Sequence, residues 1–322
     1  MPVNHHTPMK TKNLLALSLL ILTGTTTLRA DTFGSGPDTF TIDFVNIGNA
    51  GNGNNGSNVS VSAGGVAYGF NMGVTEVAQD WITKATNLGL SNVTAGAWAG
   101  NQPAADLTWY EAAAFVNFLN VSTGHQAAYQ LDSGNTALTL WSSAQAWQAG
   151  GENLYRHKDA YYFLPSENEW YKAAYHKNDG VTANYWYYPT VSNTAPTPVA
   201  GGTVAGTAVY NGGAVVAPAD VTNAGGLSAY GTLGQGGNVV EWRESAFDGV
   251  NDAPSEYRVF GGGSWASAAI QLSTGLLSGN DPAFSDSTTG FRVASVPEPS
   301  CAGLLLSASL LSLAQRRRRA AL

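Results

Sequence analysis

The chain has 322 residues, of which 44% are hydrophobic, 11% are aromatic and only 11% are charged, whereas a typical globular domain has about 25% charged residues. Nine Trp, fourteen Tyr and eleven Phe can fill a large core, which excludes a chain disordered by charge repulsion. A formal net charge of −7 leaves no basic footprint for nucleic acid, so we expect no nucleic-acid partner.

Residues 1–30 have the layout of a secretory signal peptide. Lys10 and Lys12 precede an apolar run at residues 14–22, and a small residue, Ala30, follows at the expected cleavage point. The apolar run is shorter than the roughly 20 residues that span a bilayer. We therefore expect export, with cleavage after Ala30.

The next stretch, residues 31–295, is acidic and has no cysteine. It carries 21 acidic and 8 basic residues, a formal charge of −13, because the other seven basic residues lie at the two ends of the chain. The one cysteine, Cys301, lies in the C-terminal tail. Disulfides, thiolate metal sites and cysteine nucleophiles are therefore excluded from residues 31–295.

Apolar patterns predict the first regular elements of this stretch. Residues 40–47 and 65–72 are expected to form short strands. Residues 78–88 are expected to form a helix with one buried face, which would carry Trp81, Ile82 and Ala85.

Two further helices begin at capping boxes, in which a Thr or Ser cap is followed three residues later by Glu. Thr108 and Glu111 form the first box, and Ser166 and Glu169 form the second. Each box is expected to stabilise its helix by about 0.5–2 kcal/mol. Because the box accounts for Glu169, we do not interpret Glu167 and Glu169 as paired catalytic carboxylates.

Glycine-rich segments follow the helices. Residues 190–237 predict loops and short strands, and the motifs at 237–242, 258–265 and 290–294 predict further short strands. Helices followed by glycine-punctuated strands, without βαβ alternation, favour a single irregular α+β domain with little regular secondary structure.

Residues 296–322 form a tail of three parts. A Val-Pro-Glu-Pro-Ser segment precedes an apolar stretch at 301–314 and four arginines at 316–319, which would hold the end of the stretch at the cytoplasmic face of a membrane. This tail resembles a PEP-CTERM sorting signal. The resemblance implies an exosortase as processing partner, membrane contact only through this tail, and a place on the surface or in the extracellular matrix of a Gram-negative bacterium.

Six motifs of residues 31–295 resemble, in order, those of the formylglycine-generating enzyme family, also called the sulfatase-modifying factor domain. They are Glu76 with Val77, the aromatic helix at 109–120, Leu-Pro-Ser-Glu-Asn-Glu-Trp at 164–170, Gly-Asn-Val-Val-Glu-Trp at 237–242, Arg-Val-Phe-Gly-Gly-Gly-Ser-Trp at 258–265 and Gly-Phe-Arg-Val at 290–293. The resemblance implies a single irregular α+β domain related to C-type lectins.

The resemblance does not extend to the oxidase chemistry of the family. Those enzymes bind copper through two cysteines, and the matching positions here are Ser267 and Leu272. Cu(I) prefers thiolates, so we expect no copper, no catalytic residues at these positions and no formylglycine formation. A related branch uses histidine-ligated iron, but His125, His157 and His176 are not paired at helical spacing, and hydrogen-bonding roles are favoured for His157 and His176.

The resemblance also implies a calcium ion at the segment 237–242. Glu241 would supply a carboxylate, and Gly237 and Val239 would supply carbonyl oxygens, which are the hard ligands that calcium prefers. An Asn ligand of the enzymes falls at Gly234, which has no side-chain oxygen. The alternative is a Glu241 carboxylate that accepts hydrogen bonds in a turn, and the sequence leaves both open.

We expect a non-catalytic protein that recognises a glycan, such as an extracellular polysaccharide, or a peptide. The family positions nearest to a groove are Ser264, Trp265, Ser267 and Arg292. Aromatic residues around the second capping box could also form a binding platform, although packing is favoured for them; they are Tyr155, Tyr161, Tyr162, Tyr185, Trp186, Tyr187 and Tyr188. The alternatives are an enzyme of different chemistry on the same scaffold, either a metal-dependent oxidoreductase or a protein-modifying enzyme, and a structural matrix component.

Overall fold

The computed structural model describes residues 28–56, 62–94, 96–211 and 215–297. The core of the predicted signal peptide and the tail from residue 298 onward lie outside these ranges. Within the described ranges, no helix has the length and apolar character needed to cross a membrane.

A five-stranded antiparallel sheet forms one face of the domain. Its order is β1(Leu28–Phe33), β2(Phe40–Ile47), β3(Phe70–Gly73), β15(Ala294–Ser295) and β8(Tyr162–Phe163), so both ends of the described chain enter the same sheet. The strand predicted at 40–47 is confirmed with the same bounds. Of the strand predicted at 65–72, only the end is extended in the sheet, and residues 65–69 form a loop.

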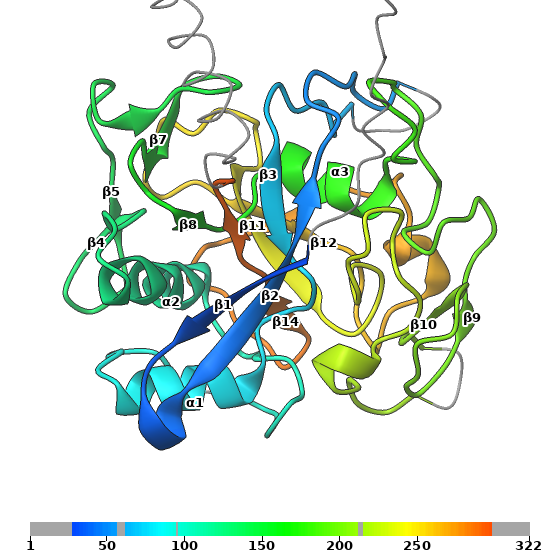
Figure 1. The fold of residues 1–322 in the computed structure, drawn as a ribbon, viewed down its shortest axis with the longest axis horizontal. Helices are drawn as coiled ribbons and strands as arrows, with labels where there is room; N and C mark the ends of the chain where they lie inside the picture. The colour runs from blue at the N-terminus through cyan, green and yellow to red at the C-terminus, as the bar shows by residue number, and fades with distance from the viewer. Residues whose placement is uncertain (1–27, 57–61, 95, 212–214, 298–322) are drawn as a thin grey trace, which may run out of the picture.

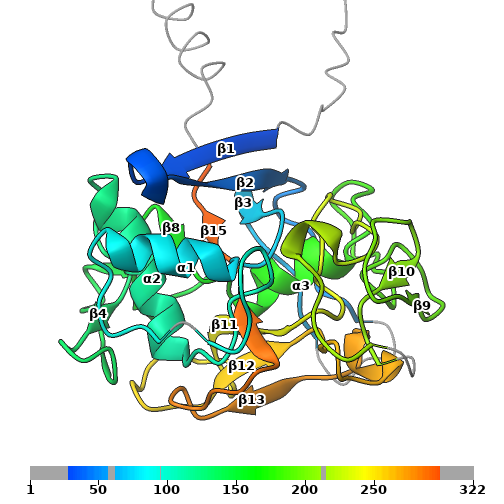
Figure 2. The same cartoon turned by 90° about the horizontal axis from the view of Figure 1, so that it is seen from below.

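A second, four-stranded sheet lies on the opposite face (Figures 1 and 2). Its order is β13(Ser278–Asn280), β12(Arg258–Gly261), β11(Val240–Ala246) and β14(Thr289–Phe291), with β11 and β14 parallel. Three two-stranded pairs complete the strands of the described chain: β4(Gln130–Leu131) with β5(Leu138–Thr139), β6(Ala146–Trp147) with β7(Asn153–His157), and β9(Thr197–Pro198) with β10(Thr207–Ala208).

Three α-helices lie between the two sheets in the view of Figure 2. They are α1(Gln79–Asn87), α2(Trp109–Ser122) and α3(Glu167–Tyr175), and short 3₁₀ turns occur at Gly36–Asp38, Val221–Asn223 and Ala269–Leu272. Both predicted capping boxes are confirmed, because Thr108 and Ser166 each accept from the backbone N–H of the Glu three residues later. Few helices among many short strands confirm the predicted irregular α+β domain.

Buried tryptophans connect the helices to the second sheet. Trp109 of α2 donates its indole N–H to the Arg243 carbonyl oxygen at 2.9 Å, and Trp242 of β11 donates to the Leu107 carbonyl oxygen at 3.0 Å. Both side chains are fully buried, so these bonds satisfy the one polar atom that each large ring carries into the core. The start of α2 is thereby fixed against β11, which also carries the glutamates described below.

Candidate functional site

The two positions that match the family cysteines are closed off from solvent. The Ser264 backbone N–H donates to Ser267 Oγ at 2.8 Å, and the two hydroxyl oxygens lie 3.2 Å apart. Leu272 is fully buried and packs with Ala208, Tyr188 and Tyr210, next to the turn that holds the serines. The hydroxyls thus bond within a turn, and the leucine belongs to a small core.

Trp265 lies beside these serines, but Arg292 does not share their surroundings. The Trp265 ring is half-buried and meets the Trp98 ring edge to face, with the ring centroids 5.8 Å apart. Arg292 is fully buried, and its guanidinium donates to the Glu241 carboxylate. It also donates to the carbonyl oxygen of Gly73 at 3.0 Å and to that of Leu233 at 2.9 Å. Of the four predicted groove residues, three therefore lie together, and Arg292 is a buried linker between segments far apart in the sequence.

Glu241, the predicted calcium ligand, is the ion-pair partner of Arg292. Arg292 Nε and Nη2 each donate to a different Glu241 oxygen at 2.6 Å, and the Trp170 indole N–H donates to Glu241 Oε2, also at 2.6 Å. A carboxylate held in this way by a guanidinium is satisfied without an ion. Among the described residues, no three His, Cys, Asp or Glu side chains gather as a metal-binding group.

None of the other positions predicted for the calcium site carries a side-chain oxygen. A Cβ at Gly234, the position of the family Asn ligand, would lie 2.3 Å from Glu76 Oε1, and the backbone there has a φ of +74°. Val239 is almost fully buried, and the Gly237 N–H donates to the Gly262 carbonyl oxygen at 3.0 Å. The contacts therefore do not favour calcium at Gly237, Val239 and Glu241, where the ion stays a prediction.

Glu76 makes this cluster acidic in the core. Its carboxylate is fully buried, accepts from Asn238 Nδ2 at 3.1 Å through one oxygen, and has no hydrogen-bond partner on the other among the described residues. Burial raises the pKa of Glu76 to about 7, although the Arg292 guanidinium opposes the shift. The residue that marks the first family motif is thus a buried group that titrates near neutral pH.

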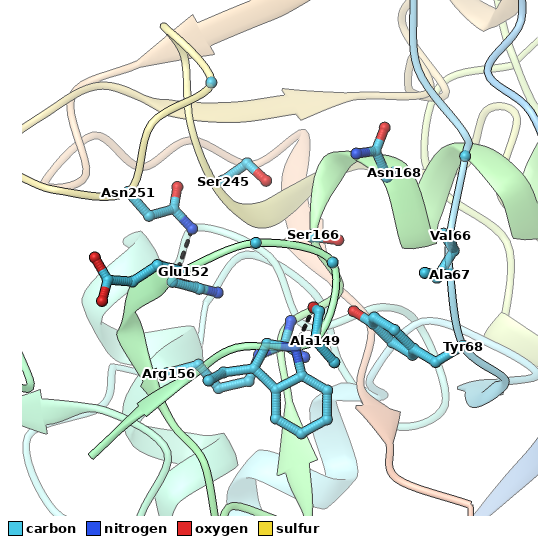
Figure 3. Close-up of a pocket in the computed structure, with 16 residues that line it drawn as sticks. Val66, Ala67, Tyr68, Ala149, Glu152, Arg156, Ser166, Asn168, Ser245 and Asn251 are labelled. Carbon is cyan, nitrogen blue, oxygen red and sulfur yellow. Dashed lines mark hydrogen bonds between the residues drawn. The ribbon is translucent and has the colours of Figure 1, made fainter. Parts of the chain in front are cut away.

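An open pocket of about 190 Å³ is lined by residues other than those of this cluster (Figure 3). Four segments surround it: the loop before β3, the β6–β7 hairpin, the start of α3 and the loop after β11. Its walls carry polar, aromatic and glycine residues, namely Gly65, Val66, Ala67, Tyr68, Trp147, Ala149, Gly150, Gly151, Glu152, Asn153, Arg156, Ser166, Asn168, Ser245, Gly249 and Asn251.

A buried ion-pair network forms the floor of this pocket. Arg156 of β7 donates to Glu244 at 2.6 Å and to Glu169 at 3.0 Å through the same Nη2, and all three side chains are almost fully buried. Tyr129 donates its hydroxyl to Glu244 at 2.9 Å, and Tyr68 donates to Glu169 at 2.8 Å. Each oxygen of the two carboxylates therefore accepts a hydrogen bond, and the Arg156 charge is balanced by buried carboxylates of the protein itself.

The pKa values of the two floor carboxylates, Glu244 and Glu169, are shifted in opposite directions. Burial raises the pKa of Glu244, and the nearby Arg156 only partly opposes that shift. For Glu169 burial acts in the same sense, but its bonds from Arg156 and Ser166 outweigh it, and the pKa of Glu169 is lowered. Burial and the charge of Glu169 raise the pKa of the Tyr68 hydroxyl, which stays a neutral donor.

The walls of the pocket combine aromatic rings with free hydrogen-bond donors. Tyr68 and Trp147 meet edge to face, with ring centroids 5.5 Å apart. The hydroxyl of Ser245 accepts from the Glu167 N–H and can still donate its proton to a ligand, whereas the hydroxyl of Ser166 also bonds the Glu169 carboxylate. Rings and hydroxyl donors of this kind suit a ligand with an apolar face and many oxygen atoms.

Sequence reasoning missed most of this pocket. It assigned Glu169 to the capping box, which is confirmed, but the same carboxylate also reaches Arg156, thirteen residues earlier in the chain. Trp147 stands in a strand of two residues, where no pattern signals a wall. The histidines do serve as hydrogen-bonding or packing residues: His176 Nδ1 lies 2.9 Å from the Tyr230 hydroxyl, and His157 packs against Trp141.

The chain matches the model of the sulfatase-modifying factor enzyme 1-like domain over residues 47–296. Its fold is similar to that of the Treponema denticola variable protein 1, with a TM-score of 0.57 and 21% identity over 85% of this chain and all of that one. It is also similar to the crystal structure of CarF (0.55, 18% identity, 80% of this chain and 99% of that one) and to PvdO from Pseudomonas aeruginosa (0.52, 14%, 83% and 98%). No curated protein matches the sequence.

Proposed function

This chain belongs to the sulfatase-modifying factor enzyme 1-like family, and we propose that its domain is a non-catalytic module that binds an extracellular glycan in the polar pocket of Figure 3. The observation that carries the proposal is the pocket itself. It offers two aromatic rings, Tyr68 and Trp147, beside hydroxyl and amide groups on a rigid, fully hydrogen-bonded floor. Aromatic faces and hydroxyl donors are complementary to the two faces of a sugar ring.

The family-motif positions support a binding role over the oxidase chemistry of the family. The thiols are replaced by Ser267 and Leu272, and both side chains are buried. The Ser264 and Ser267 hydroxyls bond each other, and no described His, Asp or Glu is in hydrogen-bond contact with either of them as a general base. The side chains at these family positions thus serve here in a turn and in a small apolar cluster.

The termini support the biological setting of this proposal. A signal peptide and a tail of the PEP-CTERM type would export the protein and present it to an exosortase, at the cell surface or in the polysaccharide matrix. A formal charge of −13 on residues 31–295 would keep such a protein soluble. The ligand expected there is the polysaccharide of the producing organism.

Co-sedimentation with this polysaccharide tests the proposal through a matched pair of variants. Trp147→Ala removes a wall of the pocket, whereas Trp98→Ala removes a half-buried tryptophan beside the family-motif serines. We expect saturable binding by the unmodified mature protein and by Trp98→Ala, and at least about a tenfold loss for Trp147→Ala, the effect of losing one stacked ring. A loss confined to Trp98→Ala would place binding at the family-motif face, and no binding by any form would remove the glycan proposal.

A further inference from the structure

A second, apolar cavity adjoins the polar pocket. It has a volume of about 180 Å³ and is lined by Tyr68, Gly69, Phe70, Trp147, Ala149, Phe163, Val296 and Pro297. None of these side chains carries a charge, and the hydroxyl of Tyr68 is turned to Glu169 at 2.8 Å. The cavity therefore offers almost only carbon atoms to a ligand.

The two cavities share one wall. Tyr68, Trp147 and Ala149 line both of them. The Trp147 indole N–H donates to the Ala149 carbonyl oxygen at 2.9 Å, so the ring orientation is fixed and its polar atom is already satisfied. A ligand that contacts this ring pair has a polar space on one side and an apolar space on the other.

The charges around the polar pocket disfavour acidic sugars. Arg156 is the one cation among the lining residues, and its Nε, Nη1 and Nη2 donate to Glu169 and Glu244. With these two carboxylates and Glu152 at the rim, the pocket carries more negative than positive charge. A uronic or sulfated sugar would meet no free cation and would be repelled.

From this juxtaposition, and resting on the proposed glycan-binding function, we infer that the pocket selects a neutral hexopyranose with a methyl-terminated substituent, an acetamido or a 6-deoxy group. The ring hydroxyls accept from the Ser245 hydroxyl and the Asn168 amide in the polar pocket. The methyl group enters the apolar cavity against Trp147 and Phe163, where it is removed from water.

Calorimetric titration with methyl glycosides tests this inference on a protein that ends after Pro297 and so keeps both tail residues of the apolar cavity. The series is N-acetylglucosaminide against glucoside, D-rhamnoside against D-mannoside, and glucuronide and glucosaminide as acidic and basic probes. We expect an acetamido or a 6-deoxy sugar to bind at least about fourfold more tightly than its hydroxyl counterpart, the effect of burying one methyl group. The two matched pairs show which substituent is preferred, and the glucuronide should be the weakest ligand.

Gly69→Leu is the variant that separates the two cavities. Gly69 lines only the apolar one, and a Cβ there would meet the Ile47 carbonyl oxygen at an ordinary 3.8 Å. The leucine should remove the preference for methyl-bearing sugars while binding of the parent glucoside and the thermal unfolding temperature stay unchanged.

Each other outcome has a defined meaning. Equal affinities within each pair, or tightest binding of the glucuronide or the glucosaminide, would overturn the inference. The proposed function would still hold if the protein binds the polysaccharide. An unchanged methyl preference in Gly69→Leu would also overturn it. If neither the glycosides nor the polysaccharide bind, the proposed function fails as well.

Discussion

Glu169 and Arg156 join the start of α3 to the floor of the polar pocket. The Glu169 carboxylate accepts from the Ser166 N–H at 2.6 Å, which closes the capping box, and from Arg156 Nη2 at 3.0 Å. The same group thus completes the N-terminal cap of α3 and holds the guanidinium that packs 3.7 Å from the centroid of the Phe163 ring. Because the ion pair is buried, the shape of the pocket depends on it.

Replacing Arg156 by methionine should strongly destabilise the domain. The substitution leaves Glu169 and Glu244 buried without their shared cation, and breaking a buried ion pair costs about 3–5 kcal/mol. Urea unfolding of the purified variant measures this loss. The triple variant Arg156→Met, Glu169→Gln, Glu244→Gln should regain part of it, because no charge is then stranded; a loss below about 1 kcal/mol in the single variant would contradict the account.

Glu76 should make the protein less stable as the pH rises. Its pKa in the folded protein is about 7, against 4.5 in an exposed carboxyl, so the folded state binds the additional proton between these values. The contribution is fully present below pH 4.5 and is lost as the pH rises through 7, by about 3 kcal/mol at most. Urea unfolding from pH 4 to 8 measures the slope.

Glu76→Gln is the control for this pH dependence. Glutamine keeps the shape and can accept from Asn238, but it does not titrate. The difference in unfolding free energy between the two proteins isolates Glu76 from Glu244, whose pKa is also raised, and from Glu169, whose pKa is lowered. Parallel pH profiles of wild type and variant would show that folding does not raise the pKa of Glu76.

Leu272→Ala should behave as a core substitution. The leucine is fully buried among Tyr188, Tyr210 and Ala208, so its truncation should cost about 2–5 kcal/mol in unfolding free energy. Polysaccharide binding below the unfolding transition should be unchanged, because the pocket lies elsewhere. If the folded Leu272→Ala variant lost polysaccharide binding, Leu272 would belong to the binding site.

The mature N-terminus should precede β1. Leu28, Arg29 and Ala30 pair with Val45, Phe44 and Asp43 of β2, and Arg29 also forms an ion pair with Asp31 at 2.7 Å. The cleavage predicted after Ala30 would remove half of this edge strand, and each lost cross-strand pair costs roughly 0.2–1 kcal/mol. N-terminal sequencing of the exported protein locates the cleavage. A protein that starts at residue 31 should unfold at lower urea concentration than one that starts at residue 28; equal midpoints would restore the original prediction.

Local patterns predicted the fold better than the site. The capping boxes at Thr108 and Ser166 and the strand at 40–47 depend on neighbours within a few residues, and all three occur as expected. Residues 65–69 form a loop where a strand was predicted. The cause is that N–H groups there donate to asparagine side chains and not to a neighbouring strand; the Gly65 N–H, for example, donates to Asn54 Oδ1.

The polar pocket depends on contacts that no local pattern records. Arg156 meets Glu244 across 88 positions of sequence, and Arg292 meets Glu241 across 51. From the sequence, Glu241 could be a calcium ligand or a hydrogen-bond acceptor in a turn. Its partner Arg292 comes close only when the chain folds. The family motifs pointed to Ser264 and Ser267, which are conspicuous in sequence because they shape a turn.

A glycan that binds at Trp147 should change the surroundings of its indole N–H, which nuclear magnetic resonance can follow. A ¹H–¹⁵N spectrum of the mature protein resolves the indole N–H groups, which include Trp147 at the pocket and Trp98 and Trp265 at the family-motif face. On titration with oligosaccharides from the native polysaccharide, we expect a saturable shift of the Trp147 signal and none for the other two. Shifts of Trp98 and Trp265 with an unmoved Trp147 would contradict binding at Trp147.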